Sequence, residues 1–536
     1  MPRLLQDWMT GQARTRPDAT AVVSDGSRLT YGELDEASNR LARLLLDGGC
    51  RRGDRVVLLM PKSPMAIVAL LGIYKADCIY VPIDPSSPAP RVSTILDSCE
   101  NTWILAAGPV ARLLEDLVHG ERWGSRSIGW LERDRPDGDF RVQFTLDDVA
   151  GFSGAPVASR NTSEDPAHIL FTSGSTGVPK GVVITHSGVI QVVEWAVKYF
   201  GMTSADRVSA HSPLHFDLSF FDIFGAAAAG AEIHVVPPEL NVLPNKVADF
   251  IRSSGLTQWF SVPSVFKYLA AFDVVRPNDF PALKRAIWAG EVLPTPTLIH
   301  WMQRLPHVRF TNLYGPTETT IVSSCYTVPE CPTDPRAPIP IGAACGGEEL
   351  MVLSESRQPV PPGEIGELCI GGVGLARGYW RDPERTGAAF VPHPQRPAER
   401  LYRTGDLARE GDDGQMYFLG RRDSQIKSRG YRIELGEIEA ALNALSGVRD
   451  CAVVAVRSAG FEGSTICCAY VPAEGSGLTP ARLRRDVRRL IPGYMLPARW
   501  LAFHALPKIA SGKTDRRRLE QAFEEEEVHA HAAQTA

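Results

Sequence analysis

The chain has 536 residues, of which 44% are hydrophobic and 22% are charged. These proportions are those of soluble globular proteins and exclude a disordered chain, a fibre or a membrane bundle. There are 57 Lys and Arg residues against 62 Asp and Glu, and the net charge of -5 gives no indication of a nucleic-acid or anionic-lipid partner. The length predicts about three or four domain-sized units.

The cysteines and the N-terminal segment bear on the compartment. The 10 cysteines form no C-x-x-C pair, and the first residues contain no long apolar stretch of the kind found in signal peptides. No run of about 18 apolar residues that could cross a membrane occurs in the sequence. Because free thiols in a chain without a leader fit a reducing compartment, we expect a cytoplasmic protein with no membrane partner.

The first part of the chain, to about residue 420, alternates strand-like and helical patterns. Residues 55–60 predict a buried strand, residues 64–76 a helix with apolar side chains at helical spacing, and residues 230–236 another strand. Such alternation predicts α/β layers with mainly parallel sheets. Residues 121–165 are richer in Arg, Asp, Gly and Ser, and we expect them to form a surface excursion.

The composition changes after Gly420, where a polar, turn-prone linker is followed by a short α+β pattern. This pattern predicts a helix over residues 437–445, strands over 451–456 and 465–471, and a helix that begins at Thr479 with Pro480 in its first position. We therefore expect three parts: a large N-terminal lobe of layered α/β sheets over 1–422, a small mobile α+β domain over 423–523, and a disordered tail over 524–536.

The strongest local motif is the segment FTSGSTGVPKG at residues 171–181, directly after a predicted strand end. Glycines let a backbone approach a ligand closely, and hydroxyls, exposed N–H groups and an ammonium suit phosphate oxygens. The segment is no Walker A loop, because Pro179 stands where that loop has its second glycine. The alternative is a plain glycine- and serine-rich surface loop.

Four further motifs follow this loop in the order NLYGPTET at 312–319, YRTGD at 402–406, GRRDSQIKSRG at 420–430 and Gly512-Lys513. Together they resemble the adenylate-forming superfamily, and more specifically the adenylation domains of nonribosomal peptide synthetases. The resemblance runs from about residue 6 to about residue 520. Additional matches lie at residues 29–34, 80–85, 366–368, 378–379 and 492–497.

The resemblance implies a ligase that joins a carboxylic acid to ATP, releases pyrophosphate and passes the acyl group to a thiol. The ATP-binding residues that it implies are Thr172, Ser173, Gly174, Ser175, Thr176, Gly177, Lys180, Asn312, Tyr314, Gly315, Thr317, Asp406, Phe418 and Arg421. Among these, Tyr314 would stack on adenine, Asp406 would accept hydrogen bonds from the ribose hydroxyls, and the residues from Thr172 to Lys180 would hold the β,γ-phosphates. Glu318 would hold Mg²⁺, which prefers oxygen ligands.

The same resemblance places catalytic residues on the small domain. Lys513 would bridge the substrate carboxylate and the attacked phosphate, where charge builds up in the transition state. Asp423 would be the hinge about which the small domain rotates between the two half-reactions. In the second half-reaction the loop from Lys427 to Gly430 would replace Lys513, and Gly430 would leave room for a pantetheine arm.

The residues FDLSFFDIF at 216–224 correspond to the segment with which the family recognises its amino acid. Asp217 stands where an acid pairs with the α-ammonium group, a role that acyl- and aryl-activating relatives do not need. Its alternative role is to cap the following helix. The remaining substrate-binding residues implied by the resemblance are Leu218, Phe221, Phe260, Ile287, Ala289, Gly290, Leu313, Ile321 and Val322.

No residue of this wall is charged or carries a hydrogen-bonding side chain, so a polar substrate side chain would be left unpaired. Phe221 and Phe260 add bulk and favour a shallow pocket for a small apolar amino acid. We expect L-proline, in keeping with a further resemblance to free-standing prolyl-activating enzymes. L-alanine, valine or a related nonproteinogenic amino acid stays open, because one methylene is worth only ~1–3 kcal/mol.

The chain ends soon after Lys513, and we expect a free-standing enzyme that loads a separate phosphopantetheinylated carrier protein in trans. Five arginines between residues 482 and 489 could meet an acidic carrier, although a solvated helix face is the simpler interpretation. His211 and His215 flank the substrate segment and could contact the substrate or pack in the core. Two rival functions remain: an acyl- or aryl-CoA ligase of the same fold, and a catalytically silent scaffold relative.

Overall fold

The computed structural model describes residues 3–100, 102–120, 123–174, 177–457, 464–508 and 514–535, with side chains described as far as residue 526. All counts of elements below refer to these residues. The chain divides into two compact units. The first comprises Met1–Pro85, Leu96–Phe171 and Gly181–Arg422, and the second comprises Ser86–Ile95, Thr172–Lys180 and Asp423–Ala536.

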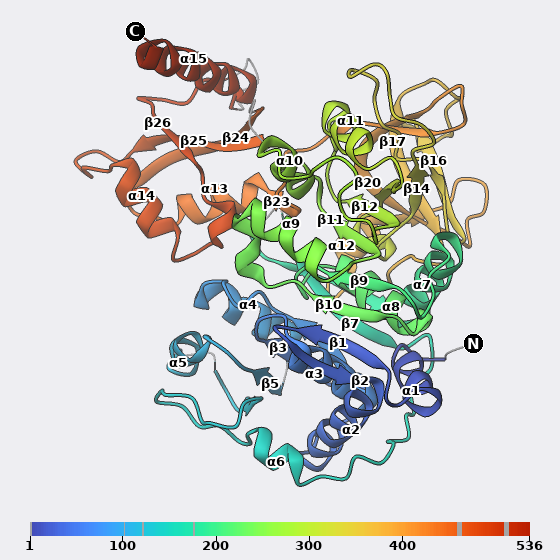
Figure 1. Cartoon of the computed structure of the whole chain (residues 1–536). Helices are drawn as coiled ribbons and strands as arrows, with labels where there is room; N and C mark the ends of the chain where they lie inside the picture. Colours follow the sequence, from blue (N-terminus) through green and yellow to red (C-terminus); the bar gives the residue numbers. More distant parts are fainter. Residues whose placement is uncertain are drawn as a thin grey trace. The chain divides into compact units, whose positions relative to one another are not determined.

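A nine-stranded sheet in the first unit has the order β15-β14-β13-β12-β11-β9-β10-β1-β2. Its central pairs, from β1 and β10 through β12 and β13, are parallel, and antiparallel strands lie at both edges (Figure 1). The strands are β1 Thr20–Ser24, β2 Ser27–Thr30, β9 Arg207–Ala210, β10 Glu232–Val235, β11 Gln258–Ser261, β12 Arg285–Ala289, β13 Arg309–Tyr314, β14 Ser324–Thr327 and β15 Ala343–Ala344.

A seven-stranded sheet has the order β18-β8-β7-β4-β3-β5-β6. The strands are β3 Arg55–Leu59, β4 Ile79–Pro82, β5 Trp103–Ala106, β6 Ser127–Trp130, β7 Pro166–Thr172, β8 Lys180–Thr185 and β18 Gly378–Tyr379. The expectation of a surface excursion over 121–165 is wrong for β6. This strand pairs in parallel with β5, and its Ile128 and Trp130 are 1% and 2% exposed.

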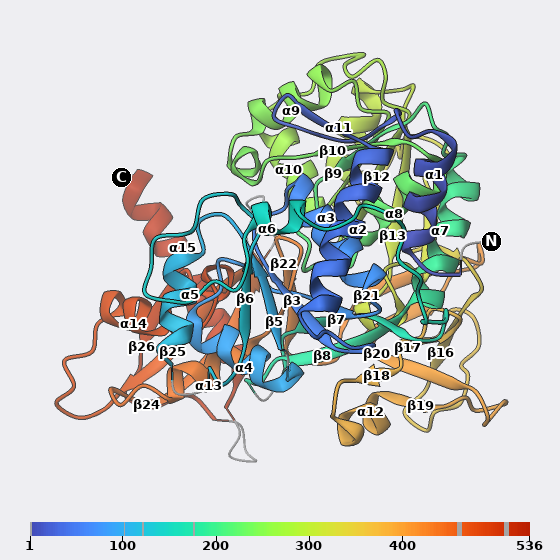
Figure 2. The same cartoon turned by 90° about the horizontal axis from the view of Figure 1, so that it is seen from below.

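Helices alternate with the parallel strands, so the predicted mainly parallel α/β architecture is confirmed. They are α1 Gln6–Thr15, α2 Tyr31–Asp47, α3 Pro64–Lys75, α4 Ala89–Cys99, α5 Ala111–Val118, α6 Leu146–Ala150, α7 His186–Phe200, α8 Leu218–Ala229, η1 Pro238–Val242, α9 Pro244–Ser253, α10 Pro263–Ala271, α11 Thr295–Arg304, η2 Thr317–Thr319 and α12 Pro383–Ala389. The helices α2 and α3 pack against each other (Figure 2). A reciprocal capping box between Thr30 and Glu33 starts α2, and Ser63 caps α3.

The alternation does not continue to residue 420 as the sequence pattern predicts. From β16 onward the first unit forms an antiparallel sheet of the order β16-β17-β20-β19, with β21 added against β20. Between these strands the described chain has only β18, which pairs with β8 in the seven-stranded sheet, and the short helix α12. The strands are β16 Glu348–Leu353, β17 Gly366–Gly372, β19 Phe390–Pro392, β20 Arg400–Glu410 and β21 Met416–Arg421.

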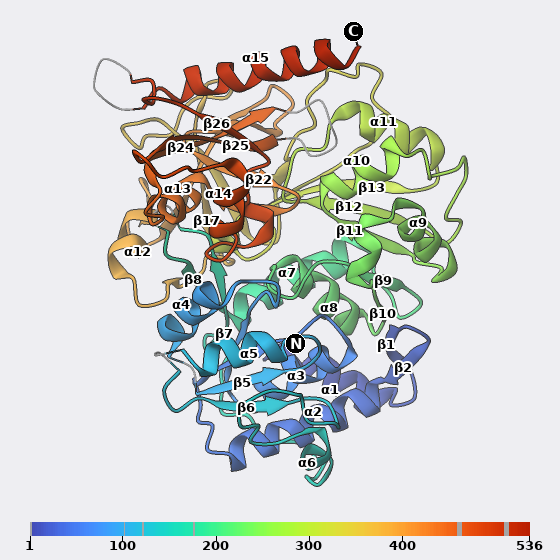
Figure 3. The ribbon, with the colours of Figure 1, turned by 90° about the vertical axis from the view of Figure 1, so that its left-hand side faces the viewer.

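The second unit contains a two-stranded hairpin and a three-stranded sheet of the order β24-β25-β26, both visible in Figure 3. Its elements after residue 423 are β22 Gln425–Ser428, β23 Tyr431–Glu434, α13 Leu435–Asn443, β24 Val448–Arg457, β25 Ser464–Pro472, α14 Pro480–Val487, η3 Gly493–Met495, β26 Arg499–Ala502 and α15 Arg516–Thr535. The Thr479 side chain accepts the N–H of Arg482, so the predicted start of α14 is confirmed. The backbone beyond residue 524 belongs to α15, which differs from the expected disordered tail, because the fully buried Leu519 and Phe523 anchor this helix.

Candidate active site

Three of the predicted nucleotide-binding residues meet in the first unit. Tyr314 ends β13, and its hydroxyl donates to Oδ2 of Asp406 over 2.6 Å. The guanidinium of Arg421 pairs with Oδ1 of the same carboxylate, since Asp406 and Arg421 are neighbours across β20 and β21. Arg421 also donates to the carbonyl oxygen of Thr404 over 3.0 Å. Adjacent strands thus bring together residues that lie far apart in the sequence.

Both carboxylate oxygens of Asp406 accept from a neighbouring side chain. Asp406 is 2% exposed, and a buried charge needs a partner, which the Arg421 guanidinium supplies. Burial, reinforced by the negative Asp406, raises the pKa of the Tyr314 phenol well above its usual value, so the phenol stays protonated and donates. An ionised carboxylate has about four acceptor positions, of which these two contacts use only part. The remainder can accept hydrogen bonds from ligand hydroxyls.

Asn312, Gly315 and Phe418 are three further predicted nucleotide-binding residues of the first unit. The Asn312 side-chain amide donates to the carbonyl oxygen of Pro340 over 2.8 Å. Phe418, on β21, packs against the hydrophobic cluster that contains Tyr314. A side chain at Gly315 would place its Cβ 2.6 Å from the carbonyl oxygen of Ile321, so only glycine fits this close approach of two backbone segments.

Glu318 lies in the short helix η2 and is fully buried. The Tyr379 hydroxyl donates to its Oε1 over 2.8 Å, and the Ala376 N–H donates to its backbone carbonyl over 2.9 Å. Tyr379 belongs to a motif that supports the family resemblance, but the sequence assigns it no role in the site. The backbone after η2 is unusual, because Thr320 and Ile321 have φ of 56° and 70°. For a β-branched residue this is a strained conformation, which is typical of functional sites.

No group of three or more His, Cys, Asp or Glu side chains that could hold a metal ion occurs among the residues that the structure describes. A cation at Glu318 would therefore need ligands from a bound molecule as well. Mg²⁺ is commonly held in this way, by one or two carboxylates together with substrate phosphates. The buried carboxylate of Glu318 fits such a site by the chemistry of its donor atoms.

Asp217 directly precedes α8 and is 8% exposed. Its side chain makes no capping hydrogen bond to the helix, and its backbone is already helical, with φ of -61° and ψ of -28°. The alternative role of a helix cap is therefore not what this carboxylate does. A carboxylate held at this depth interacts strongly with a cation, because little water screens it.

The eight predicted side chains of the pocket wall all belong to one hydrophobic cluster of the first unit, and none is more than 6% exposed. They come from α8, from the adjacent parallel strands β11, β12 and β13, and from the segment after η2. These residues are Leu218, Phe221, Phe260, Ile287, Ala289, Leu313, Ile321 and Val322. The rings of Phe221 and Phe260 meet edge to face with centroids 5.0 Å apart. Gly290, which follows β12, has φ of 92°, a conformation that favours glycine.

The two histidines beside Asp217 pack in different ways. The His211 ring nitrogens lie 2.9 Å from Asn241 Oδ1 and 3.2 Å from Ser261 Oγ, and the ring packs on Trp259. Burial lowers the pKa of His211 to about 3, so the ring is neutral. His215 lies 3.9 Å from the Asp84 carboxylate. His211 therefore supports the segment from the core side.

The glycine-rich loop belongs to the second unit. Ser173 donates to the carbonyl oxygen of Arg432 over 2.7 Å, and the buried Thr172 hydroxyl has no hydrogen-bond partner in the described chain. Lys180 opens β8, and Gly177 has φ of 82°. Ser175, Thr176 and the catalytic candidate Lys513 lie outside the described residues.

Lys427 and Gly430 lie on the hairpin of β22 and β23, where Ser428 pairs with Tyr431 across a two-residue turn. Both turn residues have positive φ, 53° at Arg429 and 81° at Gly430. This is the backbone of a type I′ turn, in which glycine is strongly preferred at the second position. The turn geometry alone therefore accounts for a glycine at this position.

The AMP-binding enzyme family matches residues 9–380, and its C-terminal domain matches residues 437–513. The chain belongs to the AMP-binding enzyme family. Adenylation domains of nonribosomal peptide synthetases are among its relatives, as the motifs predict. Adenylation domains use ATP.

Tyrocidine synthase 3 of Brevibacillus parabrevis is 36% identical over 96% of this chain, and tyrocidine synthase 1 of the same organism is 34% identical over 95%. The chain spans only 8% and 44% of the lengths of these two proteins. Among solved structures, the Vibrio cholerae adenylation domain AlmE in complex with glycyl-adenosine-5'-phosphate is similar, with a TM-score of 0.83 and 26% identity, covering 98% of both chains.

A second solved structure is PA1221, a protein with adenylation and carrier domains, with a TM-score of 0.77, 25% identity and coverage of 96% of this chain and 84% of its own. Its likeness and that of AlmE confirm the predicted α/β fold with a large N-terminal and a smaller C-terminal part. No helix of the described chain is both long and apolar enough to span a membrane.

Proposed function

We propose that this chain activates a small apolar amino acid, with L-proline favoured, as an aminoacyl-adenylate and transfers it to the phosphopantetheine thiol of a carrier protein. The observation that carries the proposal is a carboxylate, Asp217, that is 8% exposed and directly precedes a wall of eight apolar side chains. An acid in these surroundings suits an ammonium group next to an uncharged side chain.

In the first half-reaction a carboxylate oxygen of the amino acid attacks the α-phosphorus of ATP, the bond to the β-phosphate bridge breaks, and pyrophosphate leaves. The Asp406 carboxylate, oriented by Tyr314 and Arg421, supports a role in holding the ribose hydroxyls. Glu318, oriented by Tyr379, would hold Mg²⁺, which supplies charge stabilisation at the phosphates. Lys513 would neutralise charge between the carboxylate and the attacked phosphate.

In the second half-reaction the carrier thiol attacks the acyl carbonyl, a thioester forms, AMP leaves and the thiol proton passes to solvent. Asp423 would serve as the hinge of the small domain, and the turn at Gly430 would make room for the pantetheine arm. The likeness to PA1221, which contains a carrier domain of its own, supports a carrier protein as the acceptor. We expect the reaction to take place in the cytoplasm, because all ten cysteines are free thiols.

The rival functions differ in what they demand of Asp217. An acyl- or aryl-CoA ligase has no ammonium to bind, so it would not need an acid at this position. The likeness to an adenylation domain solved with glycyl-adenosine-5'-phosphate also favours an amino acid. A silent relative would need none of the partners that hold Asp406 and Glu318 in place.

The deciding experiment is ATP–pyrophosphate exchange with a panel of amino acids, fatty acids and aryl acids. We expect exchange with small apolar amino acids, led by L-proline, with L-alanine and valine as the nearest alternatives. Asp406→Ala serves as the inactive control, because it removes the acceptor for ribose. A charged or large aromatic amino acid in the lead would refute the pocket assignment, and exchange with no amino acid at all would refute amino-acid activation.

A further inference from the structure

A lysine that is not one of the proposed wall residues hydrogen-bonds to the segment that leads to Asp217. Lys62 lies between β3 and α3, and its ammonium donates to three successive backbone carbonyls, those of Ala210, His211 over 2.6 Å and Ser212 over 3.4 Å. The first of these carbonyls belongs to the last residue of β9, Ala210, and the other two follow the strand directly. An ammonium has three donors, so the three contacts can use all of them.

A second buried ionisable group, Asp222, lies one turn into α8 and acts on Lys62. Asp222 is fully buried. Burial raises the pKa of Asp222 well above its usual value, while Lys62 and the backbone N–H groups of His211 and Ser212 oppose this rise. Conversely, burial lowers the pKa of Lys62 to about 7, and the charge of Asp222 counteracts part of that shift. The two groups therefore lie near enough to act on each other.

Lys62 and Asp222 both act on the peptide groups of residues 210–212. Carbonyls of residues 210–212 bind Lys62, and the N–H groups of His211 and Ser212 are directed at Asp222. Asp222 itself lies on the helix that carries the wall residues Leu218 and Phe221. Lys62 thus holds the end of β9, and Asp222 lies in the first turns of α8, at the other end of the segment that presents Asp217.

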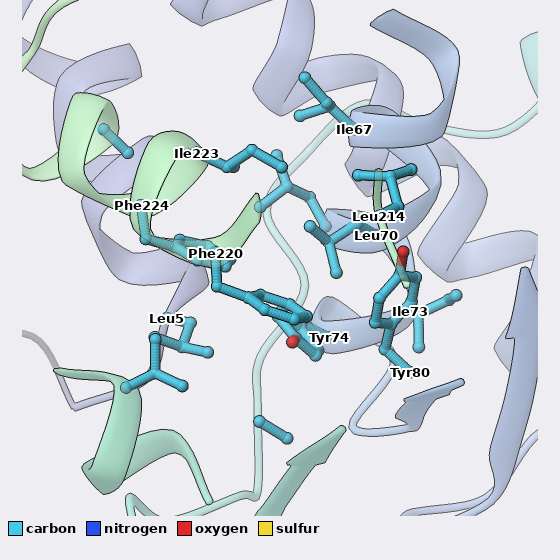
Figure 4. Close-up of a cluster of buried hydrophobic side chains, with 14 of the residues drawn as sticks. Leu5, Ile67, Leu70, Ile73, Tyr74, Tyr80, Leu214, Phe220, Ile223 and Phe224 are labelled. Atoms are coloured by element: carbon cyan, nitrogen blue, oxygen red, sulfur yellow. The ribbon is translucent and has the colours of Figure 1, made fainter. Parts of the chain in front are cut away.

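The rest of this segment is held by apolar packing and turns. Leu214 belongs to the same buried cluster as Leu70 and Ile73 of α3 and Phe220 of α8, as Figure 4 shows. Backbone bonds from Phe216 to Pro213 and from Phe220 to Asp217 form successive turns. In the same segment His215 lies 3.9 Å from the Asp84 carboxylate, so Lys62 and Asp222 share the electrostatic part of the support with this contact.

We propose that Lys62 and Asp222 are positioning residues that hold segment 210–217 so that the Asp217 carboxylate meets the ammonium group of the substrate. They act through Asp217 and do not contact the amino acid. The inference rests on the proposed amino-acid activation, and it identifies a determinant of substrate affinity outside the wall residues.

The test is a double-mutant cycle between Lys62 and Asp217, read in ATP–pyrophosphate exchange at varied amino acid and varied ATP. Lys62→Met should raise the KM for the amino acid at least 10-fold and change the KM for ATP less than 3-fold. In an Asp217→Asn background the same substitution should change kcat/KM for the amino acid less than 3-fold, because the carboxylate to be positioned is gone. Lys62→Arg, which keeps the charge and several donors, should recover part of the loss.

A matched control is Lys75→Met, because Lys75 is another buried lysine of the first unit, paired with Asp35 over 2.7 Å, and makes no described contact with segment 210–217. Lys75→Met should lower the melting temperature. It should also change kcat/KM for the amino acid by the same factor in the wild-type and the Asp217→Asn backgrounds. If Lys62→Met does not fold, Lys62→Arg and Asp222→Asn decide the cycle.

Equal losses in both backgrounds, or no loss from Lys62→Met in the wild-type background, would overturn the inference even though the wild-type enzyme activates an amino acid. Absence of exchange by the wild-type enzyme would instead refute the proposed function. The two failures are therefore distinguishable in one data set.

Discussion

The replacement of Asp217 by Asn tests the role of a single charge with almost no change of shape. Asp217 is 8% exposed, so its carboxylate would meet an ammonium group largely shielded from water. Removing one partner of a buried, hydrogen-bonded charge pair costs about 2–5 kcal/mol. Because 1.4 kcal/mol corresponds to a factor of ten, kcat/KM for the amino acid should fall by about 30-fold to about 4,000-fold.

The assay compares two substrates that differ only at the ammonium group. ATP–pyrophosphate exchange is measured with L-proline, or the amino acid that leads the panel, and with its analogue lacking the nitrogen, for proline cyclopentanecarboxylic acid. Wild-type enzyme should prefer the amino acid strongly, because the analogue has no ammonium group to interact with the buried carboxylate. Asp217→Asn should remove most of this preference, because its activity with the amino acid should fall while its activity with the analogue should rise or stay unchanged.

Asp279→Asn is a suitable control, because Asp279 is 9% exposed and pairs with Arg252 elsewhere in the first unit. It should affect both substrates equally and show its effect in the melting temperature. If Asp217→Asn lowers the activity towards the amino acid and the analogue by the same factor, Asp217 supports the fold only, and the assignment of an amino-acid substrate loses its main support.

Three further predictions concern the wall, the acid stability and the small domain. Phe221→Ala removes a fully buried ring that meets Phe260 at 5.0 Å, and it should cost about 3–5 kcal/mol of unfolding free energy and shift the substrate panel at least 10-fold towards larger apolar amino acids; an unchanged panel would place Phe221 outside the pocket. Burial lowers the pKa of His186 to about 4, whereas in the unfolded chain it is about 6.5. The neutral ring therefore makes its full contribution to the unfolding free energy above pH 6.5, and about 3 kcal/mol of that free energy is lost as the pH falls to about 4. Denaturant titrations at a series of pH values should show this loss, and the loss should be smaller in His186→Gln. Lys513→Ala should abolish adenylate formation but spare thioester formation from supplied acyl-adenylate, and equal loss of both half-reactions would contradict its proposed role.

Local patterns predicted the elements that carry their own signals. The strand at residues 55–60, the helix at 64–76 and the N-cap at Thr479 appear as β3, α3 and α14. In each case the information is contained within a few neighbouring residues: a continuous apolar run, a helical period or a hydroxyl before a proline. Such signals do not depend on what lies elsewhere in the fold.

Elements that depend on distant partners were missed or misplaced. The strand β6 exists because β5 offers an edge on which Ile128 and Trp130 can be buried, and its polar flanks hide this in the sequence. The helix α15 continues beyond residue 524 because Leu519 and Phe523 anchor its first turns, whereas composition alone suggests a disordered end.

The candidate site shows the same division. The motifs singled out Tyr314, Asp406 and Glu318, since their order along the chain resembles that of a known family. The contacts that orient them could not be read from the sequence, because Tyr314 and Asp406 are 92 residues apart and Glu318 and Tyr379 are 61 apart. A motif predicts which residue contacts the ligand. The partner that orients this residue depends on how distant strands pair, which the motif does not contain.

Lys62 illustrates why a list of wall residues is an incomplete account of specificity. A side chain facing the substrate contributes only if the backbone holds it within a fraction of an ångström of its working position. In this chain the backbone before Asp217 is held by Lys62, which lies outside the wall and 148 residues before the first carbonyl that it contacts, that of Ala210. Exchanging the eight wall residues for those of another enzyme would therefore change the shape of the pocket, but the new substrate would still be placed by the Lys62–Asp222 support. Variants that alter the wall and this pair together should retune the preference for an amino acid further than variants of the wall alone.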